Sequence, residues 1–187
     1  MDFKISIKLT DEDYYAFNDF CTFCLPHGKK QILGYRIFLT SLVVLIYGIY
    51  LLSSNYSVGD FLMIIPFAIM LTVLQITFKP LCRALTKKHV RELAKKGKKL
   101  YSPESEMEFY EDGFTEITPE VRSEVKYSLV ERVSVILDRS IYIHVNQVTA
   151  FIVPMSSFES KEECGRFIEF LRLKSPKVDI IEIYGKK

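Results

Sequence analysis

Two long apolar runs dominate the pattern of hydrophobic and polar positions along the chain. They cover residues 37–54 and 61–78, and neither contains a charged side chain. Each run has 18 residues, which as an α-helix at about 1.5 Å per residue would span roughly 27 Å, close to the hydrocarbon thickness of a bilayer. Because the connection between the runs is too short to form a domain, we expect a two-helix transmembrane hairpin.

The first residues of the chain follow a different pattern, with apolar and polar positions alternating from Phe3 to Leu9. This period of two predicts a β-strand with one buried face. No neighbouring strand is expected within the next 90 or so residues, and an isolated strand is unstable in water. We therefore expect Ile5 and Ile7 to pack against a sheet formed by the C-terminal part of the chain. The pair Thr10 and Asp13 resembles a capping box and predicts a helix over residues 11–25.

From Glu104 onward, short apolar stretches alternate with tight turns, for example at Asp112-Gly113. This spacing predicts six or seven strands that curl into a barrel or sandwich. Ser160 and Glu163 form a second capping-box signature and predict one C-terminal amphipathic helix. We therefore predict an α+β membrane protein whose C-terminal domain has a pleckstrin-homology-like (PH-like) plan. The predicted segments are 1–30 (strand and helix, packed on the C-terminal domain), 31–78 (membrane hairpin), 79–102 (basic stalk) and 103–187 (PH-like domain).

Charge is distributed unevenly along the chain. Residues 79–99 contain nine Lys or Arg and one acid, which gives +8, whereas residues 104–187 contain 16 acids and 11 bases, which gives −5. The loop between the apolar runs has no Lys or Arg, while Lys29, Lys30 and Arg36 precede the first run. By the positive-inside rule we expect both termini in the cytoplasm. No signal peptide is visible before the first run, and we expect that run to remain in the mature protein.

The basic segment after Pro80 can be drawn as a helix with Leu81, Cys82, Leu85, Val90 and Leu93 on one face and bases on the other. Two interpretations stay open: the bases set the topology, or they contact anionic lipid head groups. A nucleic-acid partner is not expected, because the bases lie beside the bilayer. The candidate lipid-contact residues are Lys87, Lys88, Arg91, Lys95, Lys96, Lys98 and Lys99.

Within the second apolar run, Pro66 is expected to kink the helix, either as a packing feature or as a hinge. Ala68 and Thr72 form a small-residue pair that would let the two helices approach closely. Neither run carries the buried acid, base or histidine that an ion pathway normally needs. Transport by the hairpin alone is therefore not expected.

No catalytic or metal-binding motif stands out. Cys21 and Cys24 form a CxxC pair inside a predicted helix, and without a second pair we interpret them as core-facing side chains rather than metal ligands. His144 is interpreted as a surface or edge residue rather than a general base. We therefore predict no catalytic residues, no metal, no cofactor and no enzymatic activity.

Several segments together resemble the YcxB-like family of bacterial membrane proteins. They include the turn at Glu111–Gly113, the step at Tyr127, Ser128 and Val130, and the element Val153, Pro154 and Phe158. The chain departs from the family pattern at Tyr127, where Trp is usual, and at Met155, where Lys is usual. The resemblance implies a PH-like fold and a bacterial cell membrane, and it implies no activity.

Two functions are consistent with these features. The first is a noncatalytic membrane protein whose cytoplasmic domain binds a protein partner or lipid head groups. The second is an accessory subunit that packs through its hairpin, at Pro66, Ala68 and Thr72, against a larger transporter or membrane enzyme.

Overall fold

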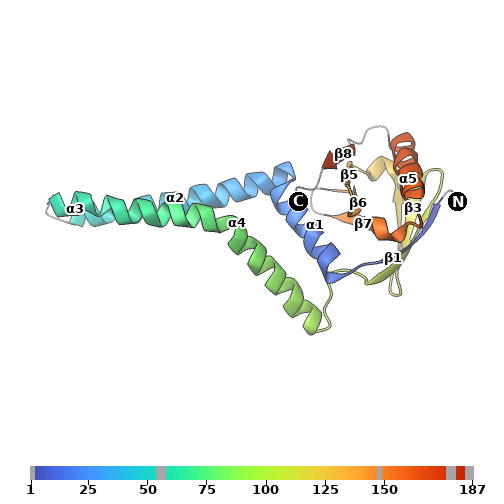
Figure 1. The fold of residues 1–187 in the computed structure, drawn as a ribbon, viewed down its shortest axis with the longest axis horizontal. Coiled ribbons are helices and arrows are strands. Elements are labelled where there is room, and N and C mark those ends of the chain that lie inside the picture. Colours follow the sequence, from blue (N-terminus) through green and yellow to red (C-terminus); the bar gives the residue numbers. More distant parts are fainter. Residues whose placement is uncertain (1–2, 54–57, 147–148, 176–179, 184–187) are drawn as a thin grey trace. The chain divides into compact units, whose positions relative to one another are not determined.

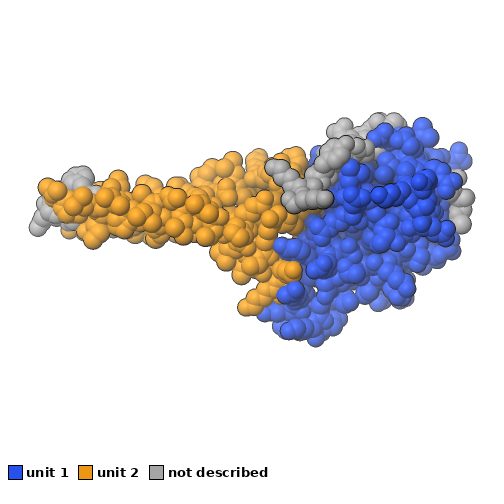
Figure 2. All heavy atoms as spheres, viewed as in Figure 1, with its two compact units in different colours: residues 1–17, 90–187 blue, residues 18–89 orange. Residues whose placement is uncertain are grey.

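The computed structural model describes residues 3–53, 58–146, 149–175 and 180–183. The chain forms two compact units, one of Met1–Phe17 with Val90–Lys187 and the other of Asn18–His89 (Figure 2). The first unit contains the sheets and the second contains the long helices. The loop residues 54–57, which include part of the connection between the apolar runs, lie outside the described residues.

Strand β1 (Phe3–Lys8) lies at one edge of a four-stranded antiparallel sheet (Figure 1). It pairs with β2 (Glu104–Phe109), with Ile5 opposite Met107 and Ile7 opposite Ser105. Ile5 and Ile7 are buried, while Lys4 on the opposite face forms ion pairs with Glu106 and Glu108. The predicted pairing of the N-terminal strand with the C-terminal sheet is confirmed.

The described strands form two sheets. The first has the order β1-β2-β3-β4, with β3 at Gly113–Ile117 and β4 at Arg122–Lys126. The second has the order β7-β6-β5-β8, with β5 at Arg132–Ile136, β6 at Ser140–His144, β7 at Ala150–Pro154 and β8 at Ile180–Ile183. Strand β8 runs parallel to β5, a pairing that the sequence pattern did not predict. Short 3-10 turns cover Tyr127–Leu129 and Met155–Ser157.

Helix α5 (Lys161–Lys174) contributes to one hydrophobic core together with both sheets. Its predicted cap is confirmed, because Ser160 Oγ accepts a hydrogen bond from the Glu163 amide at 3.1 Å. Phe167 is fully buried, and its ring lies 5.4 Å from Phe3 and 4.8 Å from Phe109. An aromatic cluster therefore joins this helix to the first sheet.

Helix α1 (Asp11–Phe23) begins at the predicted capping box. The Asp13 amide donates to Thr10 Oγ1 at 3.2 Å, and Asp13 Oδ2 accepts from the Thr10 amide at 3.0 Å. Phe17 packs edge-on against Tyr142 at 5.2 Å. The first half of α1 therefore covers the face of β6 that points away from the hydrophobic core.

Helix α2 (Pro26–Ser53) begins eleven residues earlier than the apolar run starting at residue 37. Pro26 is the first residue of α2, and proline is well suited to the first turn of a helix. A Cβ atom on Gly28 would lie 2.1 Å from the carbonyl oxygen of Cys21 and 2.5 Å from that of Thr22. Glycine is therefore required where α1 turns into α2.

The second apolar run is divided between α3 (Val58–Leu62) and α4 (Ile64–Lys95). Pro66 therefore lies in the first turn of α4, and the predicted kink inside a longer helix is replaced by a break at Met63. Helix α4 continues through Pro80, which leaves the carbonyl of Ile76 without its helical donor. Figure 1 shows that α4 runs beside α2 and then changes direction. The apolar segment and most of the basic segment thus form one bent helix.

Candidate functional site

The two long helices of the second unit contact each other through aromatic and polar side chains. Gln75 Nε2 donates to Thr40 Oγ1 at 3.0 Å, and the rings of Tyr47 and Phe67 lie 5.1 Å apart. A hydrogen bond between polar side chains is a stabilising contact where no water is available. These contacts hold α2 and α4 together as a hairpin.

The remaining faces of these helices are apolar and exposed. Both α2 and α4 are long and apolar enough to cross a membrane, and of their most apolar 18-residue windows only 6% and 0% are buried, respectively. Exposed positions include Leu45, Ile49, Ile69 and Val73. A core helix of a soluble protein is mostly buried, whereas these two helices expose a large apolar surface.

Ala68 and Thr72 do not lie on the α4 face that meets α2. Both are exposed, whereas Phe67 and Leu71 are partly buried, and the Thr72 hydroxyl donates to the carbonyl of Ala68 in its own helix at 2.9 Å. The prediction that this pair brings the two helices together is therefore wrong. The helices approach through larger side chains, and the small-residue pair faces outward.

The basic segment occupies the C-terminal part of α4 and the residues after it. Gly97 has a φ of 67°, and the Lys98 amide donates to the carbonyl of Leu93 at 3.0 Å. This Schellman geometry ends the helix. Of the residues predicted on the apolar face of this segment, Leu81 and Leu85 are exposed, while Val90 is buried. Of the candidate lipid-contact residues, Lys87 is half-buried, and Lys88, Arg91, Lys95, Lys96, Lys98 and Lys99 are exposed.

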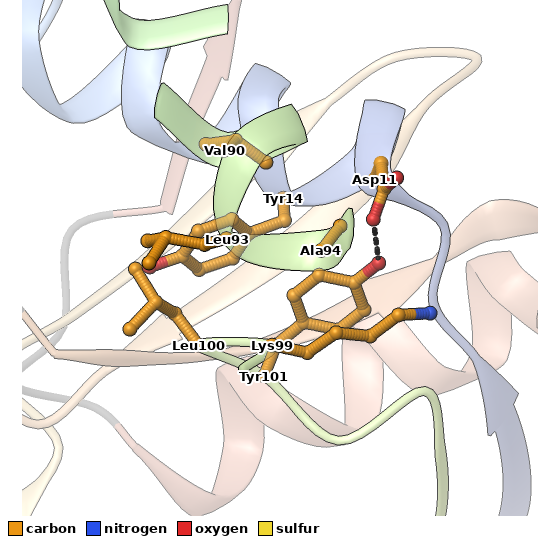
Figure 3. Close-up of a pocket in the computed structure, with 8 residues that line it drawn as sticks. All are labelled: Asp11, Tyr14, Val90, Leu93, Ala94, Lys99, Leu100 and Tyr101. Atoms are coloured by element: carbon orange, nitrogen blue, oxygen red, sulfur yellow. Dashed lines mark hydrogen bonds between the residues drawn. The ribbon is translucent and has the colours of Figure 1, made fainter. Parts of the chain in front are cut away.

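Side chains at the end of the basic segment contact the start of α1 in a cluster that we call the aromatic clasp, formed by Tyr101, Tyr14, Asp11 and Lys99 (Figure 3). Tyr101 donates a hydrogen bond to the carboxylate of Asp11, and its ring stacks on Tyr14 at 5.1 Å. Burial, together with the hydrogen bond to Asp11, raises the pKa of Tyr101 well above its usual value. The Lys99 ammonium lies 5.6 Å from the same ring. The cavity at this clasp holds only about 10 Å³, which is close to one water molecule and leaves no room for an organic ligand.

A larger groove lies beside the turn between β2 and β3. It has a volume of about 790 Å³ and includes the Glu111–Gly113 turn, Arg122, Glu124 and Lys126. Its charges have both signs, and Leu129 adds an exposed apolar side chain at the rim. Such a mixed surface fits a peptide segment better than a uniformly anionic ligand.

His144 is buried, so its predicted position at the surface is wrong. It is only 2% exposed, and its ring lies 6.1 Å from Phe17 and 6.3 Å from Tyr142. Burial, and secondarily the nearby Arg132 cation, lowers the pKa of His144 from 6.5 to about 4. The neutral imidazole is therefore part of the packing between β6 and α1.

The CxxC cysteines differ from each other in exposure. Cys21 is half-buried, and burial raises the pKa of its thiol to about 12, which makes it a poor nucleophile. Cys24 is exposed rather than core-facing, which corrects the sequence interpretation. Among the described residues, no group of three or more His, Cys, Asp or Glu side chains has the arrangement of a metal site.

Comparison with known proteins identifies one family. Residues 109–171 match the family model described as YcxB-like protein. This stretch resembles the YcxB-like family. No curated protein and no solved structure matches the chain. The resemblance inferred from sequence motifs is thereby confirmed for this segment, which runs from the end of β2 into α5.

The YcxB-like motif residues lie mainly in the core. Tyr127 and Val130 are each 7% exposed, and Val153 and Phe158 are also buried. The amide of Tyr127 donates to the carbonyl of Asp112 at 3.2 Å, which links the Glu111–Gly113 turn to the end of β4. These buried residues contribute to packing, whereas Glu111 and Asp112 of the same motif are exposed and line the groove beside β3.

Proposed function

We propose that the chain is a noncatalytic, membrane-anchored binding protein of the bacterial cell membrane. In this proposal α2 and α4 cross the bilayer, and the basic segment meets anionic head groups on the cytoplasmic side. The β domain, which we interpret as PH-like, then binds a protein partner close to the membrane. The observation that carries the proposal is the exposed apolar surface of α2 and α4 with bases at only one end.

The charge distribution supports the orientation. Arg36 precedes the apolar part of α2, and Lys79 follows the apolar part of α4. They lie at the same end of the hairpin, because Arg36 Nη2 donates to the carbonyl of Gln75 at 3.5 Å, four residues before Lys79. Cationic residues of this kind are retained on the cytoplasmic side during insertion.

The groove beside β3 supports a protein partner for the β domain. Its acids, Glu111, Asp112 and Glu124, would repel an anionic membrane surface, whereas Arg122 and Lys126 would pair with acidic side chains of a partner. Anionic lipid is better matched by the basic segment, which contains one acid among residues 79–99. The two binding roles are therefore assigned to different parts of the chain.

The orientation is tested by cysteine labelling in intact cells. We expect Val58→Cys, at an exposed position of α3 and with the native cysteines replaced by Ser, to react with a membrane-impermeant maleimide. A chain with Cys82 as its sole cysteine should react only after permeabilisation. Labelling of Cys82 in intact cells, or recovery of the protein in the soluble fraction, would contradict the proposal. Residues 55–57, the rest of the predicted external loop, lie outside the described residues.

A second function is favoured by the outward-facing pair Ala68 and Thr72. Small residues exposed on a membrane helix permit close packing against another helix, as expected for an accessory subunit of a transporter or membrane enzyme. Purification in mild detergent separates the two functions. If a stoichiometric multi-span protein co-purifies and is lost on Ala68→Leu, the accessory role is favoured. If a partner is instead lost on Lys126→Glu, partner binding at the groove of the β domain is favoured.

A further inference from the structure

A cationic pocket lies within the helical unit, where the end of α1 and the start of α2 meet α4. It has a volume of about 300 Å³ and contains no acidic side chain. Three of its residues are the cations Lys29, Arg36 and Lys79. The others are Thr22, Phe23, Ile32 and Leu33.

The cations of the pocket are not neutralised by acidic side chains among the described residues. The Nε atom of Arg36 is buried and has no hydrogen-bond partner among them, although Nη2 contacts a carbonyl oxygen. No ion pair joins Lys29, Arg36 or Lys79 to any acid in the part of the chain that the structure describes. A guanidinium whose buried Nε lacks an acceptor is costly, so this arrangement favours an anion.

The carboxylate of Asp19, in the same helical unit, is already engaged in an ion pair. Asp19 accepts hydrogen bonds from Arg83 Nε at 2.6 Å and from Nη2 at 2.7 Å, which forms a bidentate ion pair. The Arg83 guanidinium and the Lys79 ammonium both lie over the ring of Phe23, at 5.3 and 5.1 Å. Asp19 therefore neutralises Arg83 and leaves Lys79 available to a ligand.

The apolar residues next to the pocket indicate the kind of anion that it binds. Lys29, Ile32, Leu33 and Arg36 have the spacing of one helix face on α2. Leu33 and Ile37, which lies about one helical turn further along α2, are 57% and 58% exposed. An anion bound by the three cations would therefore have a continuous apolar surface beside it, as the phosphate of a lipid requires for its acyl chains.

We propose that this pocket binds the phosphate head group of one anionic phospholipid at the cytoplasmic boundary of the hairpin. The inference rests on the proposed membrane insertion and adds a defined binding site to it. Arg36 and Lys79 contact the phosphate from α2 and α4, and Lys29 supplies further positive charge at the pocket entrance. The site is separate from the general attraction of the basic segment.

Native mass spectrometry of the full-length protein in neutral detergent tests the site, with phosphatidylglycerol and phosphatidylcholine as probes. We expect one phosphatidylglycerol to bind in preference to phosphatidylcholine. Each of Lys29→Gln, Arg36→Gln and Lys79→Gln should weaken phosphatidylglycerol binding about fivefold. Arg36→Lys should retain most of the affinity. The matched control is Lys161→Gln with Arg166→Gln, which removes two exposed bases of α5 that lie outside both the pocket and the basic segment and should leave this binding unchanged.

Several outcomes would overturn the proposal. The first is equal affinity for the two lipids. The second is no effect of Lys29→Gln, a substitution at an exposed position that should not disturb folding. The third is an equal loss in the Lys161/Arg166 control. Displacement of the lipid by millimolar inorganic phosphate would show a free-phosphate site instead. If the protein is correctly inserted by cysteine labelling but shows no lipid preference, only the pocket is wrong, whereas failure of insertion contradicts the proposed function itself.

Discussion

Individual residues of this chain acquire roles that depend on what packs against them. His144 alternates with Ile141 and Ile143 along β6 and would face solvent if the sheet had one covered face. Phe17 from α1 covers the second face and makes His144 a buried neutral side chain. Its chemistry is therefore set by a residue more than 120 positions away in the sequence.

The buried imidazole predicts a pH dependence of stability. Between pH 6.5 and about 4 the unfolded chain binds a proton at His144 that the folded domain excludes. The free energy of unfolding should therefore fall as the pH is lowered through this window, at about 1.4 kcal/mol per pKa unit of difference. Denaturation of the full-length protein in detergent at several pH values measures it. His144→Leu should remove this part of the dependence, and His89→Gln, at an exposed helical position, should keep it.

Gly113 has a steric role at the Glu111–Gly113 turn. A Cβ atom there would lie 2.3 Å from the carbonyl oxygen of Val125 on the paired strand. Gly113→Ala should lower the free energy of unfolding by about 1–3 kcal/mol, because backbone atoms of β4 would have to move. Gly165→Ala is the matched control. No atom lies within 4 Å of a Cβ there, so thermal unfolding should show unchanged or slightly raised stability. Equal effects of the two substitutions would refute the steric explanation.

At the level of elements, β1 is the clearest case of a segment that needs a distant partner. It pairs with β2 along its whole length across an interval of almost 100 residues. Its buried residues enter the same core as Phe109 and Phe167. The strand therefore links the N-terminus to the β domain, although the helical hairpin separates the two in sequence.

Truncation of one core residue of β1 tests this link. Ile7 is 1% exposed, and Ile7→Ala should lower the free energy of unfolding of the β domain by about 2–5 kcal/mol. Ser6→Ala changes the neighbouring exposed position and should have little effect. The measurement is the melting temperature of the full-length protein in detergent. Equal melting temperatures for the two variants would show that β1 contributes no packing energy.

For the molecule as a whole, the proposed function combines an anchor, a basic segment and a β domain. The basic segment has two interpretations, topology and lipid contact. They predict different lipid binding by the isolated segment in vitro. A topology signal acts only during insertion, whereas lipid contact is an equilibrium property that salt weakens.

A synthetic peptide of residues 79–102 distinguishes them. If the segment contacts lipid, it should bind vesicles rich in phosphatidylglycerol, and binding should weaken as salt rises. Replacing Lys87, Lys88, Arg91 and Lys95 with Gln should cost about 1 kcal/mol for each base removed. Vesicles of phosphatidylcholine alone provide the control. Binding that is equal for the two peptides at low salt would leave only the topology role.

Much of this architecture was determined by local pattern in the sequence. The apolar runs, the caps at Thr10 and Ser160, the stop at Gly97 and the alternation in residues 3–9 each encode structure within a few positions of the residues that carry it. Hydrophobic periodicity and capping are short-range effects, so they can be read without knowing the fold.

The tertiary structure decided what lies across from each element. It buried His144 beneath α1, added β8 beside β5, turned Ala68 and Thr72 away from α2, and brought Lys29, Arg36 and Lys79 into one pocket. Burial and electrostatic environment arise from segments that are far apart in sequence. Sequence pattern therefore specified the elements, while packing between them specified which side chains are buried, exposed or brought together as a site.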